Sequence, residues 1–193
     1  MRDELFIRGT VPMTKSEVRA VSISKLELGP DSVLYDVGAG TGSVSVEASF
    51  LVPSGQVYAI EKKPEAVALI QANKEKFSAN RLWVVEGTAP EALVGLEAPT
   101  HVFLGGTSGA MEEVLNLVME KNPKVRVVIN VLALESIADV IRWLKKHSIS
   151  AEIVQVQIAK GKAAGNYHLM MGQNPVYVIS FGGEGGKCLE QCL

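Results

Sequence analysis

The sequence has few cysteines and no long apolar run, and each shortage excludes a class of protein. Its only cysteines, Cys188 and Cys192, lie close to the C-terminal end, where they cannot form the disulfide framework of a small secreted domain. No stretch approaches the roughly 18 uncharged apolar residues of a membrane-spanning helix. The N-terminal "MRDELFIRG" carries charges where a signal peptide has an apolar core. We therefore expect a cytoplasmic protein that binds no membrane. We also expect no metal site, because no further Cys or His lies near the two thiols.

The sequence also lacks an excess of basic charge. The formal net charge is −2, which gives no overall positive field to attract nucleic acid. Hydrophobic residues make up 47% of the chain and charged residues 21%, so its 193 residues can bury a substantial core. This length and composition predict one globular domain.

Strand-like and helix-like segments alternate along most of the chain, as in a parallel sheet covered by helices. The expected strands are 32–38, 56–61, 81–87, 100–106 and 125–131. The expected helices are 43–52, 64–77, 90–96, 110–122 and 134–147. The pattern then changes to two strands, 150–159 and 175–181, joined by residues 160–174, which we expect to form a long loop of the kind that often carries function.

An earlier helix is indicated by "VPMTKSEVRA", residues 11–20. Thr14 is followed three residues later by Glu17, the spacing of a capping box in which each side chain accepts a hydrogen bond from a free backbone N–H group. The segment therefore predicts a helix that begins near Thr14.

The glycine-rich segment "DVGAGTG", residues 36–42, is the strongest chemical signal, because it follows a strand and opens a helix. A dinucleotide site requires a third glycine three positions after Gly40, and Ser43 stands there instead. Asp36 would also repel a pyrophosphate. S-adenosylmethionine has no phosphate and carries positive charge, which Asp36 can offset directly or through a bound water, while the helix N-terminus after Gly42 can stabilise its carboxylate.

Two further strand ends supply parts that suit the same nucleoside. Glu61 ends the second expected strand, where its carboxylate can accept both ribose hydroxyl groups. Small residues follow the third strand and leave room for an adenine ring. The residues that we expect to bind the cofactor are Asp36, Gly38, Ala39, Gly40, Thr41, Gly42, Glu61, Gly87, Thr88 and Ala89.

With these residues assigned, the chain resembles a known family. "DVGAGTG", "AIEKKP" and "EGTAPEAL" together resemble the class I S-adenosylmethionine-dependent methyltransferases. "VPMTKSEVRA", "VFLGGTSG" and "NPVYVIS" resemble, more narrowly, the precorrin methyltransferases of cobalamin biosynthesis. The likeness runs from about Phe6 to Phe181.

The resemblance implies an α/β fold of Rossmann-like type, with a seven-stranded, mostly parallel sheet and an antiparallel C-terminal strand pair. It divides the single domain into an N-terminal lid region (1–30), a cofactor-binding core (31–147), the strand pair with its long loop (148–182) and a tail (183–193). It also implies that Thr14, in the lid, contacts S-adenosylmethionine. Such enzymes often carry an Asp at the position of His101, and we interpret that histidine as structural.

The activity implied by the resemblance is methyl transfer to C-15 of a reduced tetrapyrrole, coupled to loss of carbon dioxide from the acetate side chain at C-12. The implied assembly is a homotetramer, and a methyltransferase acting at C-5 would be a separate protein. Whether the substrate contains cobalt stays open. Because this substrate carries many carboxylates, local cations and small polar groups are candidates to bind it; as surface groups they can equally be solvated or cap a helix. The candidates are Lys15, Arg19, Gly106, Thr107, Asn130, Lys160, Lys162 and His168.

Two other functions compete. A tRNA or protein methyltransferase can share the fold, but the RNA enzymes that methylate base amino groups usually carry (D/N)PP(Y/F) after the fourth strand, where this chain has "LGGTSG". A basic stripe for RNA is missing too. A non-catalytic subunit of a methyltransferase complex is disfavoured because the glycine loop is intact.

Overall fold

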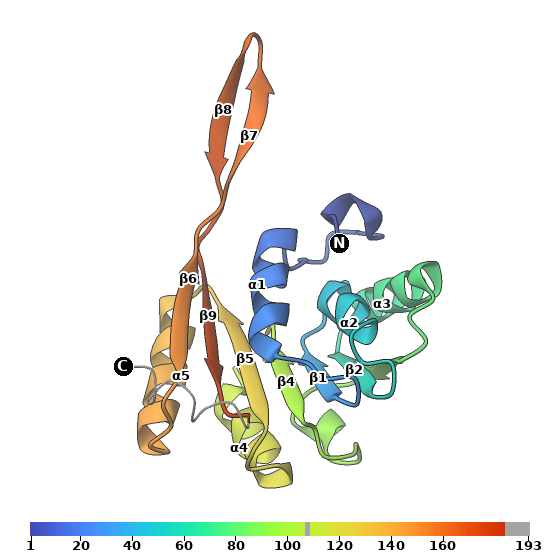
Figure 1. Ribbon diagram of the computed structural model, residues 1–193, viewed down its shortest axis with the longest axis vertical. Helices are drawn as coiled ribbons and strands as arrows, with labels where there is room; N and C mark the ends of the chain where they lie inside the picture. The colour runs from blue at the N-terminus through green and yellow to red at the C-terminus, as the bar shows by residue number, and fades with distance from the viewer. Residues whose placement is uncertain (107–108, 184–193) are drawn as a thin grey trace.

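A seven-stranded sheet forms the centre of the computed structural model, which describes residues 1–106 and 109–183 (Figure 1). The strand order is β3-β2-β1-β4-β5-β9-β6. The first five strands in sequence are parallel, whereas β9 lies antiparallel between β5 and β6. The strands of this sheet are β1 (Val33–Val37), β2 (Gln56–Glu61), β3 (Leu82–Glu86), β4 (His101–Leu104), β5 (Arg126–Val131), β6 (Glu152–Val156) and β9 (Val176–Phe181). The expected α/β fold is confirmed.

Helices cover both faces of the sheet, and the sheet is therefore buried on both sides, as is usual for parallel strands. Alternate residues of β1 show this: Leu34 packs in the layer beneath α1, α2 and α3, while Tyr35 packs in the layer beneath α4 and α5. The helices are α1 (Ser16–Leu26), α2 (Ser43–Ser49), α3 (Pro64–Phe77), α4 (Met111–Lys121) and α5 (Leu134–Lys146), with 3₁₀ turns η1 (Asp3–Leu5) and η2 (Glu91–Leu93). Among the described residues, no helix has the length and apolar character needed to cross a membrane.

The predicted helix 64–77 coincides with α3, and its Pro64 occupies the first turn, where a missing N–H group costs nothing. The prediction for residues 90–96 is wrong in type, because only η2 forms there. Gly95 lowers the helix propensity of this segment, and in a segment this short the cost of starting an α-helix is spread over few residues.

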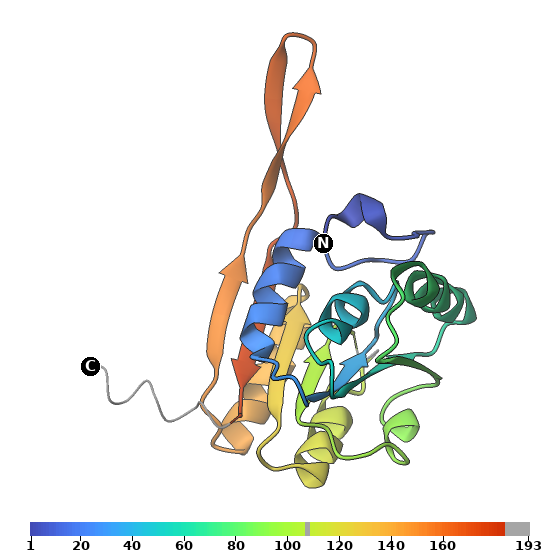
Figure 2. The same ribbon diagram turned by 45° about the vertical axis from the view of Figure 1, so that its right-hand side comes forward.

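The prediction of a loop over residues 160–174 is also wrong. The connection is a second hairpin, made of β7 (Ala159–Ala164) and β8 (Tyr167–Gly172), which stands away from the body of the molecule (Figures 1 and 2). The two strands meet at a two-residue turn, Gly165-Asn166, in which Gly165 has a φ of 61°. This dipeptide is a known hairpin signal, but few β-branched residues flank it.

The expected capping box does not form. Helix α1 is capped at Lys15 without a side-chain hydrogen bond, so Thr14 lies one residue too early to cap it. The backbone carbonyl of Thr14 instead accepts a hydrogen bond from Arg19, and the Glu17 carboxylate pairs with Lys160 of β7 at 2.8 Å. Tertiary partners therefore replace the local cap.

Candidate functional site

The carboxyl ends of the parallel strands surround a cavity of about 520 Å³. This is the edge at which open α/β sheets bind ligands. Its wall is drawn from segments distant in sequence. The lining residues are 11–15, Val18, 37–40, 60–63, 87–89, Gly105, Gly106, Asn130, Leu132, Ile158, Gln173, Asn174 and Val176.

The glycine loop forms one side of the cavity with its bare backbone. Gly38 and Gly40 have φ angles of 74° and 59°, which favour glycine. A Cβ atom added to Gly38 would lie 2.2 Å from the carbonyl oxygen of Gly106, so the loops after β1 and β4 can approach this closely only without a side chain. The N–H groups of Gly38 and Ala39 both donate to the carbonyl oxygen of Ile60, which fixes the loop against the end of β2.

Glu61 links the end of β2 to that loop. Its Oε2 accepts a hydrogen bond from the N–H group of Gly40 at 3.0 Å, and its Oε1 accepts from the N–H groups of Lys62 and Lys63. A carboxylate can accept about four hydrogen bonds. Oε2 therefore retains capacity for a hydroxyl donor from a ligand in the cavity.

Asp36 lies behind the cavity wall and does not line it. The side chain is 1% exposed, one carboxyl oxygen accepts a hydrogen bond from the Ser45 hydroxyl of α2, and Oδ1 has no hydrogen-bond partner among the described residues. Burial raises the pKa of Asp36 to about 7, against the opposing effect of the Ser45 hydrogen bond. A positive charge placed in the cavity would favour the ionised form of this carboxyl group.

The other end of the cavity is walled by β5, α1 and the root of the β7–β8 hairpin. The amide of Asn130, at the end of β5, donates to the Ser22 hydroxyl of α1 at 2.9 Å. Both side chains are buried, so α1 holds the amide in place. Leu132, Ile158 and Val176 add apolar surface beside it.

Comparison with known proteins identifies the family. A model described as "Precorrin methyltransferase domain" matches residues 5–181. The chain belongs to the precorrin methyltransferase family. A probable cobalt-precorrin-6B C(15)-methyltransferase (decarboxylating) of Pyrobaculum calidifontis is 41% identical, over 92% of this chain and 93% of the relative. The Salmonella typhimurium protein of the same name, without "probable", is 39% identical, over 93% and 94%. A crystal structure titled precorrin 8W decarboxylase, from Methanobacterium thermoautotrophicum, superimposes with a TM-score of 0.89 at 31% identity, over 94% of this chain and 99% of that chain.

As a precorrin methyltransferase, the chain carries most of its expected cofactor residues at the cavity. Those that line it are Thr14, Gly38, Ala39, Gly40, Glu61, Gly87, Thr88 and Ala89. Three do not. Asp36 lies behind the wall, and the carbonyl oxygen of the buried Thr41 accepts a hydrogen bond from Asn73 of α3. Gly42, which directly precedes α2, packs against Ile70 of α3.

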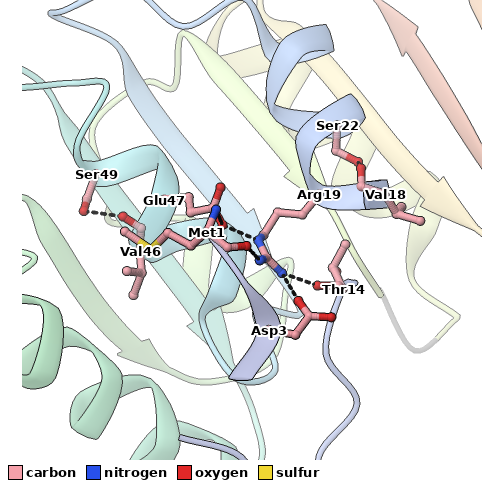
Figure 3. A network of polar contacts seen from close by, with 9 residues as sticks. All are labelled: Met1, Asp3, Thr14, Val18, Arg19, Ser22, Val46, Glu47 and Ser49. Carbon is pink, nitrogen blue, oxygen red and sulfur yellow. Dashed lines mark hydrogen bonds and ion pairs between the residues drawn. The ribbon is translucent and has the colours of Figure 1, made fainter. Parts of the chain in front are cut away.

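Arg19 does not face the cavity, contrary to our expectation. Its side chain is 0% exposed and is surrounded by Glu47, Asp3 and two backbone carbonyl groups (Figure 3). The sequence cannot show this because a cation beside a site and a cation that is buried and paired look alike until the carboxylates are placed around it.

Of the other substrate-side candidates, Lys15, Gly106 and Asn130 line the cavity. Lys160, Lys162 and His168 do not, because they lie on the exposed hairpin, where Lys160 pairs with Glu17. Thr107 and the two cysteines lie outside the described residues. In the described part of the chain, no group of three acidic, histidine or cysteine side chains is placed to hold a metal ion.

His101 lies at the amino end of β4, the end opposite the cavity. Its Nδ1 is 2.7 Å from the Thr100 hydroxyl, and burial lowers its pKa. This position and environment agree with a structural histidine.

Sequence reasoning missed Gln173 and Asn174, which line the cavity just before β9. A signal existed. Because β9 runs antiparallel to the other strands, its first residues lie at their carboxyl ends, next to the cofactor loop. Lys62 and Lys63, which follow Glu61 directly, were missed as well.

Proposed function

We propose that the chain is an S-adenosylmethionine-dependent methyltransferase that acts on C-15 of cobalt-precorrin-6B and decarboxylates its C-12 acetate side chain. The observation that carries this proposal is the cavity itself. A glycine loop whose only side chain in the lining is the methyl group of Ala39 meets Glu61 and small residues at one end, and a separate apolar and polar wall stands at the other. The names of relatives that match nearly the whole chain supply the substrate.

The described residues fit this cofactor. Glu61 has a free acceptor site for a ribose hydroxyl, the Gly38–Gly40 backbone leaves room for close approach, and the orphaned Oδ1 of Asp36 lies behind that loop. When bound, S-adenosylmethionine supplies a methyl group on a positively charged sulfur. The remaining wall, with Asn130, Gln173 and Lys15, is left to orient the acceptor.

The chain's contribution to the reaction is alignment and exclusion of water. The S–CH₃ bond breaks as the C-15–CH₃ bond forms; C-15 loses a proton, and the C-12 side chain gives up carbon dioxide and takes up a proton. Proton release and uptake balance, so the overall reaction neither consumes nor releases a proton. Holding the two reactants in line is the main source of acceleration in such a displacement.

The test is incubation of the protein with cobalt-precorrin-6B and S-adenosylmethionine, followed by mass spectrometry. We expect a product that has gained one methyl group and lost carbon dioxide, and a Glu61→Ala variant that binds the cofactor more weakly by calorimetry. Absence of cofactor binding to the wild-type protein would refute the proposal. Salt-sensitive methylation of tRNA instead would favour the alternative function.

We also propose that the protein is a homotetramer assembled through the β7–β8 hairpin. Tyr167, Leu169, Met170 and Met171 are each more than half exposed there, and a lone two-stranded hairpin is only marginally stable in water. Packing against other copies would bury these side chains. A methyltransferase acting at C-5 remains a proposed separate partner, and a cytoplasmic location remains a prediction.

Light scattering on purified protein tests the assembly. We expect a tetramer for the wild-type protein and smaller species for Leu169→Asp, because a buried unpaired carboxylate disrupts an apolar contact. Arg142→Glu, on the exposed face of α5, is the control and should leave the tetramer intact. A tetramer that survives Leu169→Asp would show that the hairpin is not the interface.

A further inference from the structure

The N-terminal strap, residues 1–15, runs above α2 and α3 before it joins α1 (Figures 1 and 2). It contacts the glycine loop and forms part of the cavity wall. Its residues 11–15 line the cavity. Its contact with the loop is close: a Cβ atom added to Gly40 would lie 2.9 Å from the carbonyl oxygen of Pro12. Apart from η1, the strap has no regular secondary structure to hold it there. Side chains from elsewhere must therefore fix its position.

Arg19 of α1 is one such side chain (Figure 3). Its guanidinium donates to the carbonyl oxygens of Thr14 at 2.5 Å and Met1 at 2.7 Å, and it pairs with Asp3 at 3.1 Å. All three partners belong to the strap. Glu47 of α2 accepts from the same guanidinium at 2.6 Å and anchors it to the body of the protein. A planar group with five donors suits this set of acceptors, and an ammonium does not.

Asn73 of α3 is another side chain that holds the strap. Its Oδ1 accepts from the N–H group of Ile7 at 2.7 Å, and its Nδ2 donates to the carbonyl oxygen of Ile7 at 3.0 Å. The same Nδ2 donates to the carbonyl oxygen of Thr41 in the glycine loop at 2.9 Å. The side chain is 0% exposed. One amide thus ties the middle of the strap to the loop that it covers.

From these contacts we infer that Arg19 and Asn73 are positioning residues of the cofactor site. Neither side chain lines the cavity. Both act through the strap, which places Met13 and Thr14 at the cavity, and Asn73 acts in addition through Thr41 of the glycine loop. The inference rests on the proposed function, because it takes S-adenosylmethionine as the ligand at that end. A substitution that removes the hydrogen bonds of either residue to the strap lowers the fraction of molecules whose strap is in place. The apparent cofactor affinity falls in proportion to that fraction.

The test is calorimetric titration of S-adenosylmethionine into Arg19→Lys and Asn73→Ala. We expect the dissociation constant to rise by about tenfold, which corresponds to a strap that is in place about one tenth of the time. With the tetrapyrrole substrate, the KM for S-adenosylmethionine should rise while kcat at saturating cofactor stays near the wild-type value. Trypsin should cleave the two variants faster than the wild-type protein after Arg8, which is exposed in the strap. The cofactor should slow that cleavage in the wild-type protein.

Two residues at the far end of the sheet provide matched controls. Arg126 also binds backbone carbonyl groups, of Lys25 and Gly182, and a carboxylate, of Glu27. Asn122 also binds a backbone carbonyl group, of Pro99. Arg126→Lys and Asn122→Ala should lower the melting temperature without changing cofactor affinity.

Equal cofactor affinity in the strap variants and the controls would overturn the inference, even if the melting temperatures of all four fell. If Arg19→Lys fails to fold, Asp3→Asn removes only one strap-side ion pair and is expected to change affinity in the same direction. A wild-type protein that binds no S-adenosylmethionine would refute the proposed function instead, so the two failures are distinguishable.

Discussion

At the scale of single residues, two separate requirements favour glycine at position 38. Its φ of 74° favours glycine, and its missing side chain lets the loops after β1 and β4 touch. The two requirements can be separated, because Gly165 in the hairpin turn has a similar φ of 61° with no neighbour within 4 Å of an added Cβ.

Gly38→Ala should therefore cost more stability than Gly165→Ala. We expect about 1 kcal/mol for Gly165→Ala from the left-handed backbone alone. For Gly38→Ala we expect at least about 3 kcal/mol, because the backbone must also move away from Gly106. Urea denaturation measures both. Equal losses would mean that the close approach to Gly106 has no energetic consequence.

The buried carboxyl group of Asp36 should make the free energy of unfolding depend on pH. An aspartate in the unfolded chain has a pKa of about 3.9, whereas burial raises the pKa of Asp36 in the folded protein to about 7. Between these values the folded state holds a proton that the unfolded chain has released. The contribution of Asp36 to the free energy of unfolding should thus be full below about pH 4 and fall by about 1.4 kcal/mol per pH unit up to about pH 7.

Asp36→Asn should remove that decline. Denaturation of wild-type protein and variant between pH 4 and pH 8 should give curves that converge or cross as the pH rises, with Asp139→Asn, a change at an exposed carboxylate, parallel to wild type. Parallel curves for Asp36→Asn as well would show that Asp36 is ionised throughout this range.

At the scale of elements, the start of α1 shows a local signal overruled by tertiary contacts. Thr14 and Glu17 have the spacing of a capping box, yet Glu17 pairs with Lys160 from a strand more than a hundred residues away in sequence. Thr14 lines the cavity instead. Its side chain is therefore expected to matter for binding and not for the helix.

Thr14→Ala tests this reading. We expect weaker binding of S-adenosylmethionine in calorimetry and a stability change below about 0.5 kcal/mol, since no cap is lost. Loss of about 1 kcal/mol of stability, the usual cost of removing an N-cap, with unchanged binding would show that Thr14 caps α1 after all.

At the scale of the whole molecule, the net charge of −2 conceals a local positive rim. Lys15, Lys62 and Lys63 line the cavity, and within residues 1–106 and 109–183 none of the three forms an ion pair. Under the proposed function, these lysines are placed to meet the carboxylates of the tetrapyrrole substrate.

Salt should therefore weaken substrate binding more than cofactor binding. Raising the ionic strength from about 0.05 M to about 0.5 M shortens the Debye length from about 14 Å to about 4 Å. We expect the KM for the tetrapyrrole to rise several-fold and the KM for S-adenosylmethionine to change little in steady-state assays. Lys63→Ala should reduce the salt effect on the tetrapyrrole. A KM for the tetrapyrrole that is independent of salt would contradict a role for the rim.

The sequence by itself determined the parts of this protein that depend on neighbouring residues. Alternating apolar segments indicated the parallel sheet, and the "DVGAGTG" turn with Glu61 at the next strand end indicated where the cofactor site lies. These signals are readable because strand, turn and helix follow one another directly in the chain, and parallel strands bring their carboxyl ends to one edge.

Only the tertiary structure decided which charges face the cavity and which hold the fold together. Arg19 and Lys160 looked like substrate ligands, but their partners Asp3, Glu47 and Glu17 come from other segments of the chain. Gln173 and Asn174 reach the cavity because β9 runs antiparallel. A charged side chain has no preferred role of its own; its role is set by which opposite charges and carbonyl groups the fold brings within hydrogen-bond distance.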